Sequence, residues 1–118
     1  MINVFETGWV LPRREGDAEV VRFLNAQTVG AQQVEGSLYR LRPGGSVGPF
    51  LEAGAYQLFY VTAGQPVAEY GGQPHALRPG CGVSCDPGET CGFANPAAGP
   101  AAFYRFVVPA GAPGARDR

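Results

Sequence analysis

Turn-forming peptides recur along this chain at short intervals and limit what it can fold into more than any other feature does. Most combine glycine with proline, aspartate, asparagine or a second glycine, and such combinations favour tight turns. They are RPGGS, TAGQ, YGGQP, RPGCG, DPGET and NPAAGP. Turns this frequent argue against a helical bundle and leave many short strands. The pattern therefore predicts an antiparallel sandwich or barrel.

The segments between the turns have the composition of strands, with many β-branched and aromatic residues. The nearest candidate for a helix, AEVVRFLNAQTVGAQ, contains β-branched residues and a glycine and lacks an apolar stripe of helical period. The Gly71-Gly72 pair fits a two-residue hairpin loop, in which positive φ angles are needed. We expect strands near residues 18–24, 34–42, 48–53, 56–62, 66–70, 74–78, 82–85, 90–94 and 102–108.

The length of 118 residues allows one domain and leaves no room for a second. We expect that domain to span residues 1–108. Residues 109–118, PAGAPGARDR, offer nothing to bury and are expected to form a disordered tail.

The charge of the chain argues against nucleic-acid binding. All nine basic residues are arginine, and with ten acidic residues the formal net charge is −1. The N-terminal segment lacks a basic region followed by an apolar stretch, and no apolar run reaches the roughly 20 residues of a membrane-spanning helix. Three closely spaced cysteines do not make a disulfide framework. We therefore expect a cytoplasmic protein that binds neither nucleic acid nor membranes.

Two motifs with fixed spacing cover the middle of the chain. In the first, Gly44 is followed after five residues by Phe50-Leu51-Glu52, after four more by Gln57, and after six more by Gly64. In the second, Gly80 is followed after five residues by Asp86-Pro87-Gly88, after two more by Cys91, and after three more by Asn95. Both spacings resemble those of the small single-domain cupins.

The resemblance covers residues 38–108 and implies an all-β fold, the double-stranded β-helix or jelly-roll barrel with two antiparallel sheets. It also implies a homodimer. In metal-binding cupins, the positions of Phe50, Glu52, Gln57 and Cys91 hold three histidines and a glutamate around iron, manganese, zinc or nickel. Here all four of these positions differ from the motif. Since alternate residues of a strand face the same side, Phe50 and Glu52 are expected to point into the barrel together.

The substituted positions decide between a metal site and another use of the barrel. Phenylalanine has no ligand atom, and a glutamine oxygen is a weak ligand for transition metals. The remaining carboxylate and thiolate mix hard and soft preferences, whereas a firm site needs three good protein ligands. His75, the chain's one histidine, falls in the predicted hairpin and is expected at the surface. We therefore expect no metal and no other cofactor.

Without a metal, the same positions describe a pocket suited to acid–base chemistry. Desolvation in an apolar barrel would raise the pKa of Glu52 towards neutrality, and such a carboxylate acts as a general acid or base near pH 7. Cys91 is the second catalytic candidate, as a neutral thiol beside that carboxylate. Gln57 offers both a donor and an acceptor to a substrate. The expected substrate-binding residues are Phe50, Gln57, Tyr39, Phe59, Phe93 and Tyr104.

These residues also have plainer interpretations. Glu52 fits a solvated position at the barrel rim, and Gln57 fits a buried hydrogen-bonding role. Cys91 fits inert packing equally well, and Phe50 fits a plug that turns the barrel into a solid core.

Three functions follow from these alternatives. The preferred one is a metal-independent enzyme that isomerises, cyclises or dehydrates a small organic molecule, such as a polyketide-like or other secondary-metabolite intermediate. The second is a non-catalytic module that binds a small molecule. The third is a metal-dependent oxygenase or isomerase with unusual ligands.

Overall fold

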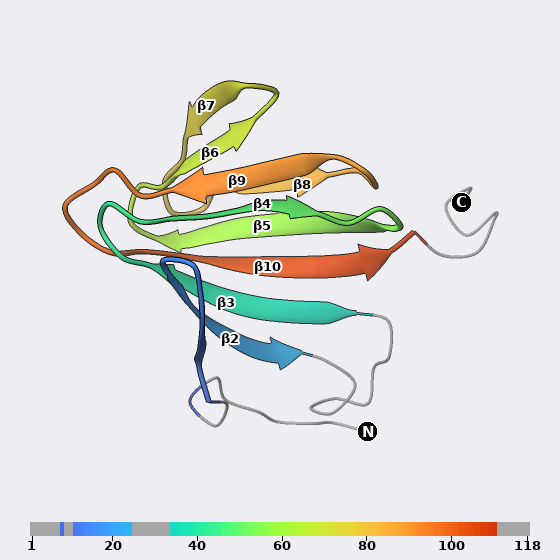
Figure 1. Ribbon diagram of the computed structural model, residues 1–118, viewed down its shortest axis with the longest axis horizontal. Helices are drawn as coiled ribbons and strands as arrows, with labels where there is room; N and C mark the ends of the chain where they lie inside the picture. The colour runs from blue at the N-terminus through green and yellow to red at the C-terminus, as the bar shows by residue number, and fades with distance from the viewer. Residues whose placement is uncertain (1–7, 9–10, 25–33, 111–118) are drawn as a thin grey trace.

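The described part of the protein consists of ten strands in two facing sheets (Figure 1). The computed structural model describes residues 8, 11–24 and 34–110, and this part contains no α-helix. The strands are β1 (Arg13–Glu15), β2 (Ala18–Leu24), β3 (Glu35–Leu41), β4 (Ser46–Leu51), β5 (Ala55–Ala63), β6 (Val67–Tyr70), β7 (Gln73–Ala76), β8 (Gly82–Cys85), β9 (Thr90–Ala94) and β10 (Ala101–Pro109).

The strand order is that of a jelly roll. One sheet has six strands in the order β1-β2-β3-β10-β5-β8, and the other has four in the order β4-β9-β6-β7. Every neighbouring pair is antiparallel. From β3 to β10 the chain passes repeatedly from one sheet to the other, which winds the strands into a double-stranded β-helix. The predicted fold class is confirmed.

The predicted strands agree with the structure to within two residues at each end. The turn at Gly71 and Gly72 is also confirmed, with φ angles of 60° and 73°. β1 was not predicted, because its three residues form an edge strand of charged side chains with no alternating apolar pattern. The expected disordered tail falls mainly on residues 111–118, which lie outside the described part of the chain.

Aromatic rings fill the space between the two sheets. Phe59, Phe93 and Phe103 are at most 1% exposed, and Phe93 stacks on Phe103 with 4.3 Å between ring centroids. Tyr39 stacks on the other side of this group, 5.2 Å from Phe103. Phe50 closes the cluster at 5.2 Å from Tyr39 and 5.5 Å from Phe59. The centre of the barrel is therefore a packed core.

The outer face of the six-stranded sheet carries a second apolar cluster. Phe23 is 7% exposed and meets Tyr104 and Phe106 edge-on, with centroids 5.6 and 6.3 Å away. Val21 and Leu38 are buried beside them. The six-stranded sheet thus has buried apolar side chains on both faces.

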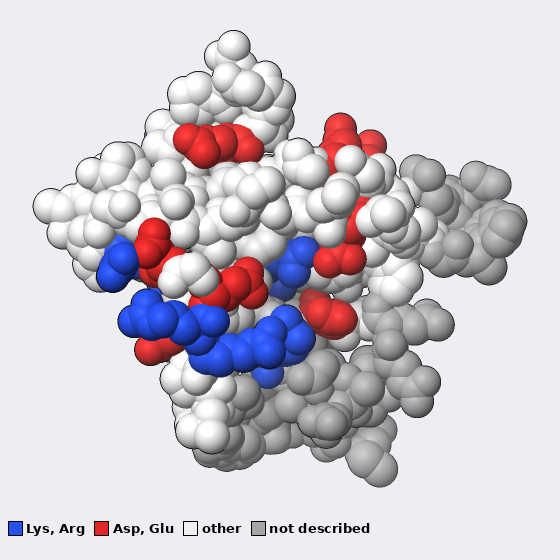
Figure 2. Space-filling view, viewed as in Figure 1, with Lys and Arg blue, Asp and Glu red and all other residues white. Residues whose placement is uncertain are grey.

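Charged side chains lie along one side of the six-stranded sheet. Figure 2 shows arginines gathered in a band with acidic side chains next to them. Arg40 forms an ion pair with Glu19 at 3.3 Å, and Arg42 forms one with Asp17. No helix in the described ranges has the length and apolarity that crossing a membrane would require.

Gly64, the last glycine of the first motif, is a position where the backbone requires glycine. Its φ is +78°, and a Cβ there would lie 2.5 Å from the Pro100 carbonyl oxygen and 2.7 Å from the Ala101 Cα. Gly72 has a similar φ of +73° with open space around it. We expect Gly72→Ala to lower the free energy of unfolding by about 1 kcal/mol, from the left-handed conformation alone. Gly64→Ala should cost about 2 kcal/mol more, because backbone atoms must move.

Urea denaturation of the two variants measures this difference. Equal costs would show that the β5–β6 connection adjusts freely and that the close approach of residues 100–101 is unimportant.

Candidate functional site

The motif positions 50, 52 and 57 come together around the turn that joins β4 to β5. Phe50 lies one residue before the end of β4, Glu52 lies just past it, and Gln57 is the third residue of β5. Phe50 and Gln57 are buried, at 6% and 1% exposed. Phe50, Glu52 and Gln57 lie around one further side chain, which contacts all three of them.

That side chain is Arg105 of β10, which is only 10% exposed. Its Nε and Nη2 donate hydrogen bonds to Gln57 Oε1 at 3.1 and 2.7 Å. Nη2 also donates to Glu52 Oε2 at 3.1 Å. The guanidinium carbon lies 4.6 Å from the centre of the Phe50 ring, in cation–π contact. We call these four side chains, Phe50, Glu52, Gln57 and Arg105, the Arg105 cluster.

Gln57 has partners at both ends of its amide. While Oε1 accepts from Arg105, Nε2 donates to the backbone carbonyl oxygens of Phe50 and Glu89 at 3.3 and 3.4 Å. A buried amide satisfied in this way has one fixed orientation. Gln57 is therefore placed to hold Arg105 rather than a substrate, which supports the plainer of its two interpretations.

Glu52 has surroundings different from those expected. Its side chain is 38% exposed, at the rim of the barrel, and forms an ion pair with Arg105. The prediction of an enclosed, apolar environment for this carboxylate is wrong, because β4 ends at Leu51 and releases the chain before Glu52 can point into the core. The arginine instead gives Glu52 a defined position that solvent can reach.

Cys91 is fully buried opposite Phe50, its register partner between β4 and β9. Burial, followed by the neighbouring Cys85, raises the pKa of Cys91 to about 12. This agrees with the expected neutral thiol, although burial rather than a carboxylate is the main cause. A buried thiol of this kind is a poor nucleophile.

The aromatic residues expected to line a cavity are part of the core. Tyr39, Phe59 and Phe93 are at most 1% exposed and pack against Phe50, which plugs the centre of the barrel. The Tyr39 hydroxyl donates to Glu15 Oε2 at 3.2 Å, and burial, followed by the Glu15 carboxylate, raises the pKa of Tyr39 to about 12.

Tyr104 was assigned to the wrong face of β10. Phe103 and Arg105 point into the barrel, so Tyr104 points outward and meets Phe23 on the outer face of the sheet. Alternate residues of a strand face opposite sides of the sheet, so residues 104 and 105 cannot both face the core. Because charged side chains are usually exposed, the sequence favours Arg105 outside and Tyr104 inside, which is the reverse of the structure. For the same reason, Arg105 was not predicted as a site residue.

A metal ion of the kind that metal-binding cupins hold does not fit this site. Phe50 supplies no ligand atom, and Gln57 Oε1 and Glu52 Oε2 already accept hydrogen bonds from a cation. No three His, Cys, Asp or Glu side chains in residues 11–24 and 34–110 form a group that could hold a metal ion. We therefore derive no chemistry through a metal.

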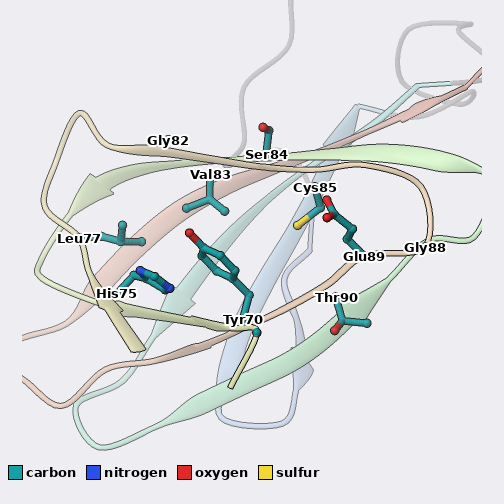
Figure 3. Close-up of a pocket in the computed structure, with 11 residues that line it drawn as sticks. Tyr70, His75, Leu77, Gly82, Val83, Ser84, Cys85, Gly88, Glu89 and Thr90 are labelled. Atoms are coloured by element: carbon teal, nitrogen blue, oxygen red, sulfur yellow. The ribbon is translucent and has the colours of Figure 1, made fainter. Parts of the chain in front are cut away.

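A cleft of about 690 Å³ opens on the other side of the buried Cys85 and Cys91. It lies between β8, the β6–β7 hairpin and the β8–β9 turn, and residues 70–71, 75, 77, 82–85 and 88–90 line it (Figure 3). In Figure 1 the β6–β7 hairpin projects away from the other strands.

Four titratable groups of this cleft were not predicted as site residues from the sequence: Tyr70, His75, Cys85 and Glu89. The ring of His75 stacks on Tyr70, with centroids 4.1 Å apart and an angle of 11°. His75 is therefore half-buried in the cleft wall and not simply at the surface. The sequence feature that could have indicated this stack is the predicted hairpin, since Tyr70 and His75 lie on opposite sides of the Gly71-Gly72 turn.

The Arg105 cluster should contribute measurably to stability. Arg105→Met keeps much of the apolar volume but leaves the buried Gln57 oxygen without its donor. We expect a loss of about 2–4 kcal/mol in the free energy of unfolding, towards the lower value because Glu52 is partly hydrated. Arg40→Met, which breaks an ion pair exposed by about half on each side, is the matched control and should cost less than about 1 kcal/mol. Urea denaturation compares the two, and equal losses would contradict a structural role for the cluster.

Solved structures with the same fold include enzymes of different kinds. A polyketide cyclase, RemF, from Streptomyces resistomycificus has a TM-score of 0.76 and 18% identity over 97% of this chain and 89% of its own. A protein from Thermotoga maritima described as a predicted oxalate decarboxylase has a TM-score of 0.80 and 19% identity over 90% and 98%. A sugar phosphate isomerase of the cupin superfamily from Silicibacter pomeroyi has a TM-score of 0.78 and 19% identity over 89% and 74%.

These likenesses, all below 25% identity, concern the fold. A search of curated proteins gives no match to this sequence. The family model described as "Cupin domain" matches residues 37–109, which contain both motifs and the whole Arg105 cluster. The chain belongs to the cupin domain family.

Proposed function

We propose that this cupin is a metal-independent enzyme that uses Glu52 as a general acid and base on a small organic molecule. The observation that carries the proposal is the contact of one guanidinium with three of the four motif positions. Arg105 supplies a fixed positive charge where metal-binding cupins hold an ion. Glu52, partly exposed at the rim, is the group of the cluster that a bound molecule can reach.

The proposed chemistry is proton transfer beside a carbonyl group. The Glu52 carboxylate removes a proton from the carbon next to the carbonyl and becomes a carboxylic acid, while the substrate becomes an enolate. Arg105 stabilises the negative charge that develops on the enolate oxygen. Return of the proton to another carbon isomerises the substrate, and delivery to a hydroxyl group that leaves as water dehydrates it.

Relatives of the same fold support this class of substrate without identifying one. One is named a polyketide cyclase and another a sugar phosphate isomerase, and polyketides and sugar phosphates carry carbonyl or hydroxyl groups. We propose a polyketide-like or other secondary-metabolite intermediate as the substrate of a cytoplasmic homodimer.

Glu52→Gln tests the role of the carboxylate. The amide keeps the shape and still accepts from Arg105 but takes no proton, so turnover should fall by roughly 10²–10⁴-fold. Glu19→Gln, which changes an exposed carboxylate of the Arg40 pair, should leave turnover unchanged. The assay follows a panel of polyketide-like thioesters and sugar phosphates by mass spectrometry and NMR.

The ion pair between Glu52 and Arg105 favours a second candidate, a module that binds a small molecule without converting it, because a paired carboxylate is a weaker base. In that case the panel gives binding without product, and Glu52→Gln leaves binding in place. That result would replace the enzyme proposal with the binding one.

Metal content separates both candidates from a metal-dependent enzyme. The purified protein should contain less than about 0.1 equivalent of iron, manganese, nickel or zinc, because the cluster offers no set of three good ligands. Elemental analysis by plasma mass spectrometry measures this content. One equivalent of any of these metals, lost together with activity on dialysis against a chelator, would contradict the proposal.

A further inference from the structure

The cleft between β8 and the β6–β7 hairpin is separate from the Arg105 cluster. None of the residues that line it belongs to the cluster. Its volume of about 690 Å³ falls in the range of roughly 300–1,000 Å³ that small-molecule sites occupy. The proposed enzyme chemistry gives this cleft no role.

One wall of the cleft is a flat aromatic surface. Tyr70 is 45% exposed although it ends a strand whose other inward residue, Ala68, is fully buried. Its ring is held by stacking on His75 at 4.1 Å. Figure 3 shows Tyr70 between His75 on one side and Cys85 and Glu89 on the other. The stack therefore supports Tyr70 from behind and leaves it facing the open part of the cleft.

The opposite wall presents a hydrogen-bond acceptor. Glu89 Oε1 accepts the backbone N–H of Asp86 at 2.7 Å, which fixes the carboxylate on the β8–β9 turn. Oε2 has no hydrogen-bond partner among the described residues. Beside Glu89, burial, followed by the charge of Glu89, raises the pKa of the Cys85 thiol, which is therefore neutral. A carboxylate accepts hydrogen bonds and repels anions, so an occupant must bring N–H or O–H donors.

We propose that this cleft is a binding site for a planar ring that carries hydroxyl or amino donors. The ring lies against Tyr70, in the stacked or edge-on arrangement that aromatic pairs prefer. A donor on the ring bonds to Glu89, and the apolar side chains Leu77 and Val83 cover the ring edge. The site stands on its own geometry and goes beyond the proposed acid–base function.

The chain carries a reporter for this site. His75 is its only histidine, so the imidazole ring protons give one resolved set of NMR signals. The probe is resorcinol, a flat ring with two hydroxyl donors, titrated at constant pH into the full-length protein. We expect a saturable shift of the His75 signals with a dissociation constant in the millimolar range, as about eight heavy atoms allow.

Two matched probes separate the contributions of the ring and of the donors. 1,3-Dimethoxybenzene keeps the ring without donors, and cyclohexane-1,3-diol keeps the donors without a flat ring. Each should bind about tenfold or more weakly than resorcinol, since each loses one of the two interactions.

Two variants with controls place the probe in the cleft. Tyr70→Leu and Glu89→Gln should each weaken resorcinol binding by about five- to tenfold. Tyr60→Leu replaces a tyrosine of similar exposure on the outer face of β5, and Glu69→Gln an exposed carboxylate outside the cleft lining. Both controls should bind as the original protein does.

The proposal is overturned if the three probes shift His75 equally, or if neither cleft variant weakens binding more than its control. Loss of turnover in Glu52→Gln has no bearing on this result, so the two proposals fail independently. Circular dichroism of each variant confirms that the fold is kept.

Discussion

The hydrogen bonds of Arg105 are the constraint on which the arrangement of the barrel end depends. A guanidinium that is only 10% exposed must satisfy its donors and balance its charge, and it does so with Gln57, Glu52 and the face of Phe50. These contacts connect β10 to the end of β4 and the start of β5, and so fix two sheets against each other. The positions that hold an ion elsewhere in the family here hold a cation that is part of the chain. Phe50 then completes the aromatic core instead of opening a cavity.

Much of the fold is predictable from the sequence because its determinants are local. Turn residues mark where strands end, and alternation marks the strands themselves, so nine of the ten strands were expected within two residues. The family resemblance also assigned residues 50, 52, 57 and 91 to one site, and the first three of these contact Arg105. β1 was missed because three exposed or half-exposed residues carry no such pattern. Local sequence information therefore predicts the strands and the positions of the site residues.

The chemistry of the site was less predictable because it depends on contacts distant in sequence. Arg105 lies 48 residues from Gln57 and 53 from Glu52, and nothing in its own strand indicates that a charge belongs inside. Charged groups generally prefer water, and this preference gives the wrong prediction for an arginine that is buried and paired. It also led to the prediction of Tyr104 on the wrong face of β10. The cleft was missed for a similar reason. Its volume comes from the separation of the β6–β7 hairpin from β8, and no short segment encodes that distance.

Gln57 joins the two regions physically. Its amide accepts from Arg105 with one end and donates to the backbone carbonyl of Glu89 with the other, while the side chain of Glu89 lines the cleft. A molecule that donates a hydrogen bond to the Glu89 carboxylate thus contacts the same β8–β9 turn whose backbone accepts from the Gln57 amide. Movement of that turn would change the support of Arg105 and, through it, the position of Glu52. Coupling requires that the two arrangements of the turn differ in how well they bind the occupant. The 3.4 Å bond from Gln57 to Glu89 is the longest of the cluster's hydrogen bonds, so the coupling free energy that it can carry is small.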